Sequence, residues 1–256
     1  MRPAHNGIPV RRPLEDKVAV VIGGGRGIGR ATALRLASAG AKVVVAARTR
    51  SELEAVVTEA TAQSGRVRAQ VVDVTHPADV KALADELRST YDCIDILVNS
   101  AGVALIAPLA ATSEADWDLV MDTNLKGTYL CVHALLDLLR ASGKALVVNI
   151  ASKVGLTGHA QVSAYAAAKA GVIGLTRALA QELGGSNIRV VALCPGPVDT
   201  PMRWAATPQM DPKLTVPAET IADAILFLAT IGERVTLGGE LVVEAVGYDP
   251  GSVPLD

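Results

Sequence analysis

The chain has 256 residues, of which 50% are hydrophobic and 20% charged, and its formal net charge is -2. Without a basic excess or an apolar run of about 18 residues, we expect neither a nucleic-acid partner nor a membrane partner. Three scattered cysteines favour no disulfide framework and no metal site, so we expect a globular protein of the reducing cytoplasm with no bound metal.

Short runs rich in Val and Ile alternate with longer runs rich in Ala and Leu along most of the chain. The expected strands cover residues 17–22, 42–47, 66–73, 94–99, 144–150, 188–193 and 240–246. The expected helices cover residues 27–38, 51–64, 77–90, 113–141, 163–183 and 217–230. The strand runs are almost continuously apolar, which is typical of strands buried on both faces. The alternation therefore predicts an α/β fold with one doubly wound parallel sheet of about seven strands and helices on both faces.

Two segments lie outside this alternation. Residues 1–13 lack the apolar centre of a signal peptide, and we expect a loose N-terminal arm there, followed by one catalytic domain over residues 14–256. Residues 201–217 contain four prolines and follow the end of an expected strand, a position where loops often cover a substrate. The segment is short, which predicts an open substrate site.

The first expected strand runs directly into a glycine-rich turn that a helix follows. The candidate binding residues of this turn are Gly23, Gly25, Arg26, Gly27, Ile28 and Gly29. Glycines let the backbone approach a pyrophosphate, and the N-terminus of a helix offers free N–H groups and the positive end of its dipole. The alternative is a tight strand–helix turn without a ligand. No Lys-Ser/Thr pair follows the last glycine, which argues against a nucleoside triphosphate loop.

The spacing Gly23-x-x-x-Gly27-x-Gly29 resembles the cofactor loop of the short-chain dehydrogenase/reductase family. The family usually has Thr before the first glycine, whereas this chain has Ile22. The resemblance covers about residues 14–246 and implies a Rossmann-type fold that binds a nicotinamide dinucleotide.

The end of the second expected strand bears on the choice of dinucleotide. An acid there binds the ribose 2′-OH of NAD, and an arginine accommodates the 2′-phosphate of NADP. No Asp or Glu occurs between Gly40 and Ser51, but Arg48 and Arg50 do. With Arg26 in the glycine turn, the pattern predicts NADP rather than NAD. The alternative is that these arginines are solvated loop charges.

Three further segments follow expected strands and match cofactor contacts of the family. Their candidate residues are Asp73, Val74, Asn99, Ala101, Gly102, Pro195, Gly196, Val198 and Thr200. In the family the aspartate caps the adenine amino group, and the Pro-Gly segment holds the nicotinamide amide. Ser100 departs from the family's Asn-Asn-Ala-Gly. Each segment alone could also be an ordinary strand-end turn.

The candidate catalytic residues are Ser152, Tyr165 and Lys169. Tyr165 and Lys169 are four residues apart in an expected helix, so they share one face. A nearby ammonium lowers the pKa of a phenol from about 10 toward the working pH, where acid–base catalysis is effective. Ser152 closes the fifth expected strand, where its hydroxyl could bind a substrate oxygen. The alternative for the Tyr-Lys pair is a surface pair without a catalytic role.

In the family a Ser, a Tyr and a Lys act with an upstream Asn, which Asn124 matches here. The resemblance implies hydride transfer between NADPH and a small carbonyl or secondary alcohol, with Tyr165 as acid and base. It further implies that Tyr165 and Lys169 contact the cofactor, and that Asn124 completes a proton relay.

Two alternatives to a general carbonyl reductase stay open. One is a 3-oxoacyl-(carrier protein) reductase, for which acidic carrier proteins would require a basic docking patch that the sequence does not offer. The other is a cofactor-binding sensor without turnover. The long helices at 113–141 and 163–183 match a pair that forms the dimer in the family, so a homodimer or homotetramer is expected.

Overall fold

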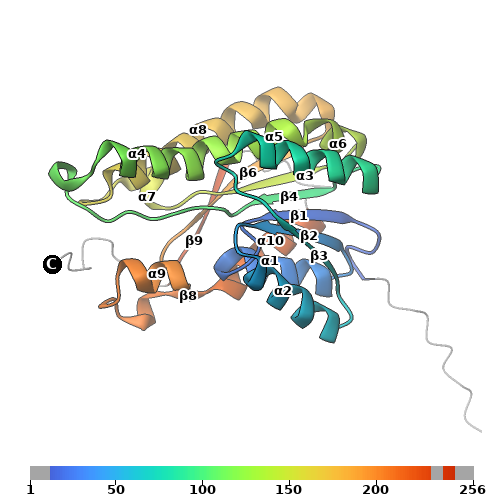
Figure 1. Ribbon diagram of the computed structural model, residues 1–256, viewed down its shortest axis with the longest axis horizontal. Helices are drawn as coiled ribbons and strands as arrows, with labels where there is room; N and C mark the ends of the chain where they lie inside the picture. Colours follow the sequence, from blue (N-terminus) through green and yellow to red (C-terminus); the bar gives the residue numbers. More distant parts are fainter. Residues whose placement is uncertain (1–11, 232–238, 246–256) are drawn as a thin grey trace, which may run out of the picture.

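A seven-stranded parallel sheet forms the centre of the computed structural model, which describes residues 12–231 and 239–245 (Figure 1). The strand order is β3-β2-β1-β4-β5-β6-β9. The order changes direction between β1 and β4, and in doubly wound sheets ligands bind in the crevice at this point, outside the carboxyl ends of the strands. The predicted doubly wound α/β fold is confirmed.

The strands are β1 (Val18–Ile22), β2 (Lys42–Ala47), β3 (Arg66–Val71), β4 (Ile96–Asn99), β5 (Leu146–Ile150), β6 (Arg189–Pro195) and β9 (Gly239–Val243), with the short pair β7 (Val198–Asp199) and β8 (Val216–Pro217) apart. Ile22, the last residue of β1, lies opposite Ala46 of β2 and Asn99 of β4. The carboxyl ends of the central strands therefore finish at the same edge of the sheet.

Burial on both faces holds for β1 and β5, all of whose residues are buried, but not for β3. Most residues of β3 are exposed, and Val71 at its end is 41% exposed. The strand forms the edge of the sheet, where one side has no neighbouring strand and helices give less cover. The expectation of full burial was wrong for this strand.

Helices cover both faces of the sheet (Figure 1). One face carries α1 (Gly27–Ser38), α2 (Arg50–Ala62) and α10 (Ala218–Ile231). The other carries α3 (Pro77–Thr90), α4 (Glu114–Met121), α5 (Gly127–Ala134), α6 (Leu136–Ala141) and α8 (Ser163–Leu183). Short helices occupy the connections, namely α7 (Val154–Thr157), α9 (Pro201–Ala206), η1 (Leu109–Ala111), η3 (Gly184–Ser186) and η4 (Pro212–Leu214). Each face has its own apolar core, built largely from Ala, Val, Leu and Ile.

The single helix expected over residues 113–141 is divided in the structure. The π-helical segment η2 (Asp122–Lys126) separates α4 from α5, and a further break at Leu135 separates α5 from α6. Within η2, the side-chain amide of Asn124 donates to the carbonyl of Val120 at 2.9 Å. This bond uses a carbonyl of the preceding turn, which is how a polar side chain competes with regular helical bonding.

The N-terminal boundary stays a prediction, because most of the expected arm lies outside the described residues. The described chain soon enters the core at Leu14, which is 3% exposed. At the other end, Val246 of the last expected strand also lies outside the described residues. Within the described ranges, none of the helices combines the length and apolar character that crossing a membrane requires.

Candidate active site

A pocket of about 470 Å³ lies at the carboxyl ends of the strands and brings together most of the predicted site residues. The predicted cofactor-binding residues that line it are Gly23, Gly25, Arg26, Gly27, Ile28, Arg48, Asp73, Val74, Ala101, Gly102, Pro195, Gly196, Val198 and Thr200. All four predicted catalytic residues line the same pocket, namely Asn124, Ser152, Tyr165 and Lys169. The pocket therefore joins the glycine turn at one end to Tyr165 at the other.

The glycine turn is held by backbone-to-backbone contact. Gly23 and Gly27 have φ values of +76° and +52°, in the left-handed region that favours glycine. A Cβ on Gly29 would lie 2.1 Å from the carbonyl oxygen of Gly23, so any larger residue would separate α1 from the turn. Gly29 itself does not line the pocket, and its part is this close packing.

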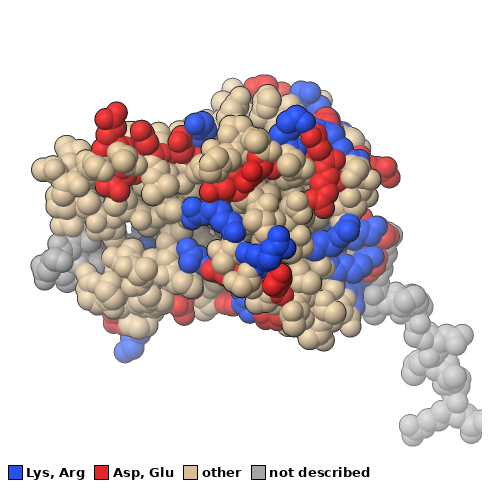
Figure 2. All heavy atoms as spheres, viewed as in Figure 1, with Lys and Arg blue, Asp and Glu red and all other residues tan. Residues whose placement is uncertain are grey.

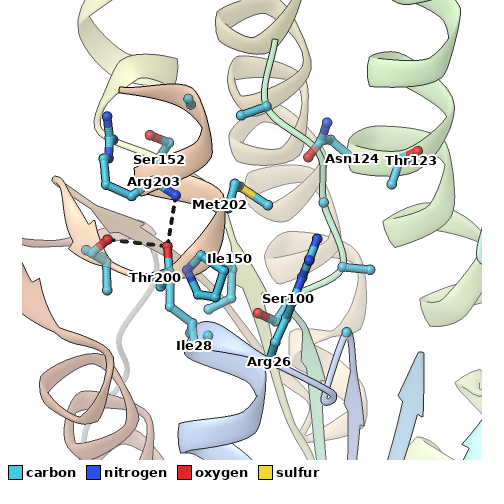
Figure 3. Close-up of a pocket in the computed structure, with 18 of the residues that line it drawn as sticks. Arg26, Ile28, Ser100, Thr123, Asn124, Ile150, Ser152, Thr200, Met202 and Arg203 are labelled. Atoms are coloured by element: carbon cyan, nitrogen blue, oxygen red, sulfur yellow. Dashed lines mark hydrogen bonds between the residues drawn. The ribbon is translucent and has the colours of Figure 1, made fainter. Parts of the chain in front are cut away.

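The start of α1 suits an anion. Arg26, at the N-cap, makes no side-chain capping bond, and the first turn holds no acidic residue. The first N–H groups of a helix have no partner within the helix, and a phosphate can accept from them. The turn therefore fits the pyrophosphate of a dinucleotide. Figure 3 shows Arg26 at this end of the pocket and Asn124 across from it.

Two arginines at this end face acids over moderate distances. Arg48 Nη1 lies 4.0 Å from Asp73 Oδ2, and Arg26 Nη1 lies 3.8 Å from Glu52 Oε1. Figure 2, in the same view as Figure 1, shows basic side chains gathered across the middle of the molecular surface, with acidic side chains among them. Arg50, the first residue of α2, is exposed and is absent from the pocket lining. Of the two arginines that follow β2, only Arg48 reaches the site.

Asp73 is held as a carboxylate. Partial burial opposes ionisation, but hydrogen bonds from the backbone and hydroxyl of Thr75, at 2.9 and 2.8 Å, together with the charges of Arg48 and His76, lower the pKa of Asp73. An ionised carboxylate at this position can accept an N–H donor, which suits an adenine amino group.

Asn99 does not line the pocket. Its amide nitrogen donates to Asn149 Oδ1 at 2.8 Å, and Asn149 in turn donates to the hydroxyl of Thr176 at 2.9 Å. These buried groups tie β4 to β5 and α8. Asn99 therefore braces the sheet beneath the pocket, because its side chain points between strands rather than beyond their ends.

Tyr165 and Lys169 share one face of α8, as predicted, and approach Ser152 beyond the end of β5. Ser152 lies close enough to the Tyr165 hydroxyl for a hydrogen bond between them to lower the Tyr165 pKa. Lys169 Nζ lies 5.7 Å from the centre of the Tyr165 ring and donates to the carbonyl of Ile150 at 2.8 Å. A proton donor, a second hydroxyl and an ammonium thus meet in one corner of the pocket.

The protonation of this corner differs from the expectation. Burial raises the pKa of Tyr165, although the charge of Arg203 and the Ser152 hydrogen bond oppose the rise. Burial also lowers the pKa of Lys169 to about 8, with a small opposing effect of Cys194. The expected lowering of the Tyr165 pKa is wrong, because the effect of burial outweighs the effects that oppose it.

Asn124 is fully buried and holds the loop after β4. Its amide nitrogen donates to the carbonyl of Val103 at 2.9 Å, and its oxygen accepts from the Val103 N–H at 3.3 Å. A Cβ on Gly102 would lie 2.6 Å from this oxygen and 3.7 Å from Lys169 Nζ. Asn124 therefore fixes the loop beside Lys169.

The other end of the pocket is lined by residues that sequence reasoning did not single out. They are Leu105, Ile106, Val154, Val162, Met202, Arg203, Ala206, Thr207 and Met210. His159 is exposed and also lines the pocket. Glu52 is another missed residue, one position beyond the interval searched for acids. The prolines of residues 201–217 were the one signal that pointed to this end.

Two neighbours of the site have structural explanations. Lys153 Nζ lies 2.5 Å from Glu244 Oε2, in an ion pair that joins the segment after β5 to the segment after β9. Cys194 is buried, and burial raises the pKa of its thiol to about 11. The thiol is therefore a packed group rather than a thiolate nucleophile.

Comparisons with known proteins agree with this geometry. The family model described as short chain dehydrogenase matches residues 17–211. The (2S)-[(R)-hydroxy(phenyl)methyl]succinyl-CoA dehydrogenase subunit of Thauera aromatica is 38% identical over 84% of this chain and 90% of its own. A 3-oxoacyl-[acyl-carrier-protein] reductase of Thermotoga maritima is 36% identical over 94% of this chain and 99% of its own.

Solved structures show the same likeness. The crystal structure of levodione reductase superposes with a TM-score of 0.85 at 32% identity, covering 90% of this chain and 97% of that one. A variant of actinorhodin polyketide ketoreductase, crystallised with NADPH, superposes with a TM-score of 0.84 at 28% identity, covering 89% and 95%. On its sequence, its fold and the residues gathered in its pocket, the chain belongs to the short-chain dehydrogenase family of oxidoreductases.

Proposed function

We propose that this oxidoreductase uses NADP(H) to interconvert a carbonyl and a secondary alcohol, with Tyr165 as the acid and base. The observation that carries the proposal is that Ser152, Tyr165 and Lys169 line one pocket that extends to the glycine turn. A proton donor at one end and a pyrophosphate cradle at the other suit a dinucleotide that spans the pocket and a small substrate beside Tyr165.

A bound nicotinamide supplies the hydride for carbonyl reduction and accepts it in the reverse direction. Tyr165 donates its proton to the carbonyl oxygen, and Ser152 donates a hydrogen bond that holds that oxygen. Because burial raises the pKa of Tyr165, the phenol is protonated at neutral pH, the form that reduction requires. Lys169 supplies positive charge beside the phenol and would bind the nicotinamide ribose of a bound cofactor, and Asn124 is the proposed next member of the proton relay.

The preference for NADP over NAD rests on Arg26 and Arg48. Both line the pocket beside the end of β2, where the adenosine ribose lies in dinucleotide folds. Their distances from carboxylates, 3.8 and 4.0 Å, leave guanidinium donors for a 2′-phosphate. The NADPH-bound ketoreductase that this chain resembles supports the same choice.

A second candidate is reduction of a 3-oxoacyl thioester on a carrier protein. The likeness to the Thermotoga maritima reductase, which extends over 99% of that protein, favours it. An acetoacetyl thioester therefore belongs in any substrate panel.

We also propose a homo-oligomer, a dimer or a tetramer, in the cytoplasm. Leu119 on α4 and Tyr129 on α5 are 49% and 47% exposed, and apolar side chains of this size on adjoining helices favour a protein contact. A monomeric mass in light scattering would contradict the assembly.

The direct test is an assay of NADPH absorbance in which the protein is mixed in turn with ketones, a diketone, a quinone and an acetoacetyl thioester. We expect consumption that falls by about 10²- to 10⁴-fold or more in Tyr165→Phe, since that variant keeps the ring and loses the proton. Undiminished turnover in the variant would refute the role of Tyr165. Binding of NADPH with no consumption of any substrate would favour a cofactor-binding sensor.

A further inference from the structure

The two ends of the pocket differ in how their charged side chains are paired. At the glycine turn, Arg26 and Arg48 each face a carboxylate. In the catalytic corner, Lys169 is hydrogen-bonded to the carbonyl of Ile150. Arg203 lies at the other end, on α9, and also lines the pocket (Figure 3). Over residues 12–231 and 239–245, it forms no ion pair.

Local bonds hold Arg203 in this position. Its N–H donates to the hydroxyl of Thr200, which caps α9, and its Nη1 donates to Thr207 Oγ1 at 3.3 Å. The nearest acid in the sequence, Asp199, instead accepts from the indole N–H of Trp204 at 2.6 Å. A guanidinium has five N–H donors, and this single side-chain bond leaves four of them for a ligand.

The surroundings of Arg203 are mostly apolar. Leu105, Ile106, Val162 and Met210 line this end of the pocket, and the last two are 8% and 6% exposed. The charge of Arg203 is also close enough to act on the Tyr165 hydroxyl. Arg203 is partly buried and has guanidinium donors to spare, so a carboxylate on a ligand would be a favourable partner for it. Arg203 lines the same pocket as Ser152 and Tyr165, so a carboxylate bound to it would lie near the oxygen that Tyr165 protonates.

We propose that the substrate carries a carboxylate close to its reacting carbonyl, and that Arg203 binds this carboxylate. The apolar side chains around it then hold a hydrocarbon body, so the substrate class is an apolar keto acid, or the matching hydroxy acid in the reverse direction. This inference rests on the proposed function. Arg203 is a specificity-determining residue in it, because a planar guanidinium fork matches the two oxygens of a carboxylate.

The test compares an apolar β-keto acid with its methyl ester, which has nearly the same shape but no charge. For the unmodified enzyme with NADPH, we expect kcat/KM to favour the acid by about 10- to 100-fold, the usual range for a charge-assisted hydrogen bond. In Arg203→Gln the ratio should fall toward one, and in Arg203→Lys it should fall part of the way. Arg68→Gln, an exposed arginine on the edge strand β3, is the matched control and should keep the ratio.

A binding measurement separates recognition from catalysis. We expect the saturated carboxylic acid to bind the enzyme–NADPH complex, by calorimetry, at least tenfold more tightly than its amide, and to lose this advantage in Arg203→Gln. A preference for the ester, or a ratio that Arg203→Gln leaves intact, would overturn the proposal. Equal losses for acid and ester, with the pH profile moved upward, would show instead that Arg203 serves only Tyr165. Failure of the proposed function differs from all of these, since neither substrate would then consume NADPH.

Discussion

The two ends of the pocket are built in different ways. At the glycine turn the geometry lies in the backbone: positive φ values at Gly23 and Gly27, and contact between Gly29 and the Gly23 carbonyl. At the substrate end the geometry lies in side chains carried by the loop after β4, the segment after β5 and α9. The first end can change little without moving strands and helices. At the second end, the substitution of a single side chain can change which ligand binds.

This contrast is tested first at the backbone. We expect Gly29→Ala to lower stability by about 1–3 kcal/mol or more and to weaken NADPH binding, because its Cβ would lie 2.1 Å from a backbone oxygen that cannot rotate away. Thermal unfolding and a fluorescence titration with NADPH measure both effects.

The matched control is Gly174→Ala. Gly174 is an exposed residue of α8 with open space around it, where alanine should raise stability by up to about 1 kcal/mol. Equal responses of the two variants would mean that the turn tolerates a side chain, and that its geometry is not fixed by backbone contact.

The same contrast explains what the sequence could predict. The strand-end positions of Gly23, Asp73 and Pro195 followed from the alternation of strands and helices, because parallel strands bring their carboxyl ends to one edge. Tyr165 and Lys169 followed from a four-residue spacing on a helix. These predictions were possible because backbone geometry alone determines the positions of these residues.

Other features could not be predicted from the sequence, because they depend on contacts between residues far apart in the chain. In the π-helical turn, the side chain of Asn124 bonds to Val103, which is 21 residues away in sequence. Asn99 follows a strand as predicted, but its partner Asn149 is 50 residues away, and only the strand register brings them together. Arg203 lies in a proline-rich segment without periodicity, where no pattern tells a pocket residue from a solvated one.

The pH dependence of activity tests the protonation of Lys169 beside Tyr165. Burial lowers the pKa of Lys169 to about 8, so its positive charge is present below that pH and lost above it. Because Lys169 lies 5.7 Å from the centre of the Tyr165 ring, losing its charge removes a positive group that favours proton transfer from the phenol, and we expect kcat/KM for reduction to fall about tenfold per pH unit above about 8. Whatever activity Lys169→Arg retains should not fall in this range, because a guanidinium keeps its charge. A flat profile for the unmodified enzyme up to pH 10 would contradict the assignment.

At the cofactor end, the corresponding test is Arg48→Ala. We expect the KM and Kd for NADPH to rise about tenfold, since one charge-assisted contact to the 2′-phosphate is lost, while those for NADH change less than about twofold. The Arg48 side chain is 54% exposed, so the effect should shrink at high salt. Arg50→Ala removes a neighbouring exposed charge that does not line the pocket, and should have a smaller effect. Equal changes for both cofactors would remove Arg48 from the 2′-phosphate site.

The smallest expected effect concerns the Lys153–Glu244 pair, which supports the substrate end through side chains. Lys153 follows Ser152, and the pair links it to the segment after β9, where the Gly196 N–H also donates to the Val243 carbonyl at 2.8 Å. Both side chains are partly exposed, at 20% and 30%, so a double-mutant cycle of Lys153→Met and Glu244→Gln should give a coupling energy of about 0.5–1 kcal/mol in unfolding. Because the pair adjoins Ser152, each variant should lower kcat by less than tenfold while leaving the Kd for NADPH unchanged. Additive stability effects, or a change in NADPH binding as large as that in kcat, would mean that the two ends of the pocket are not supported separately.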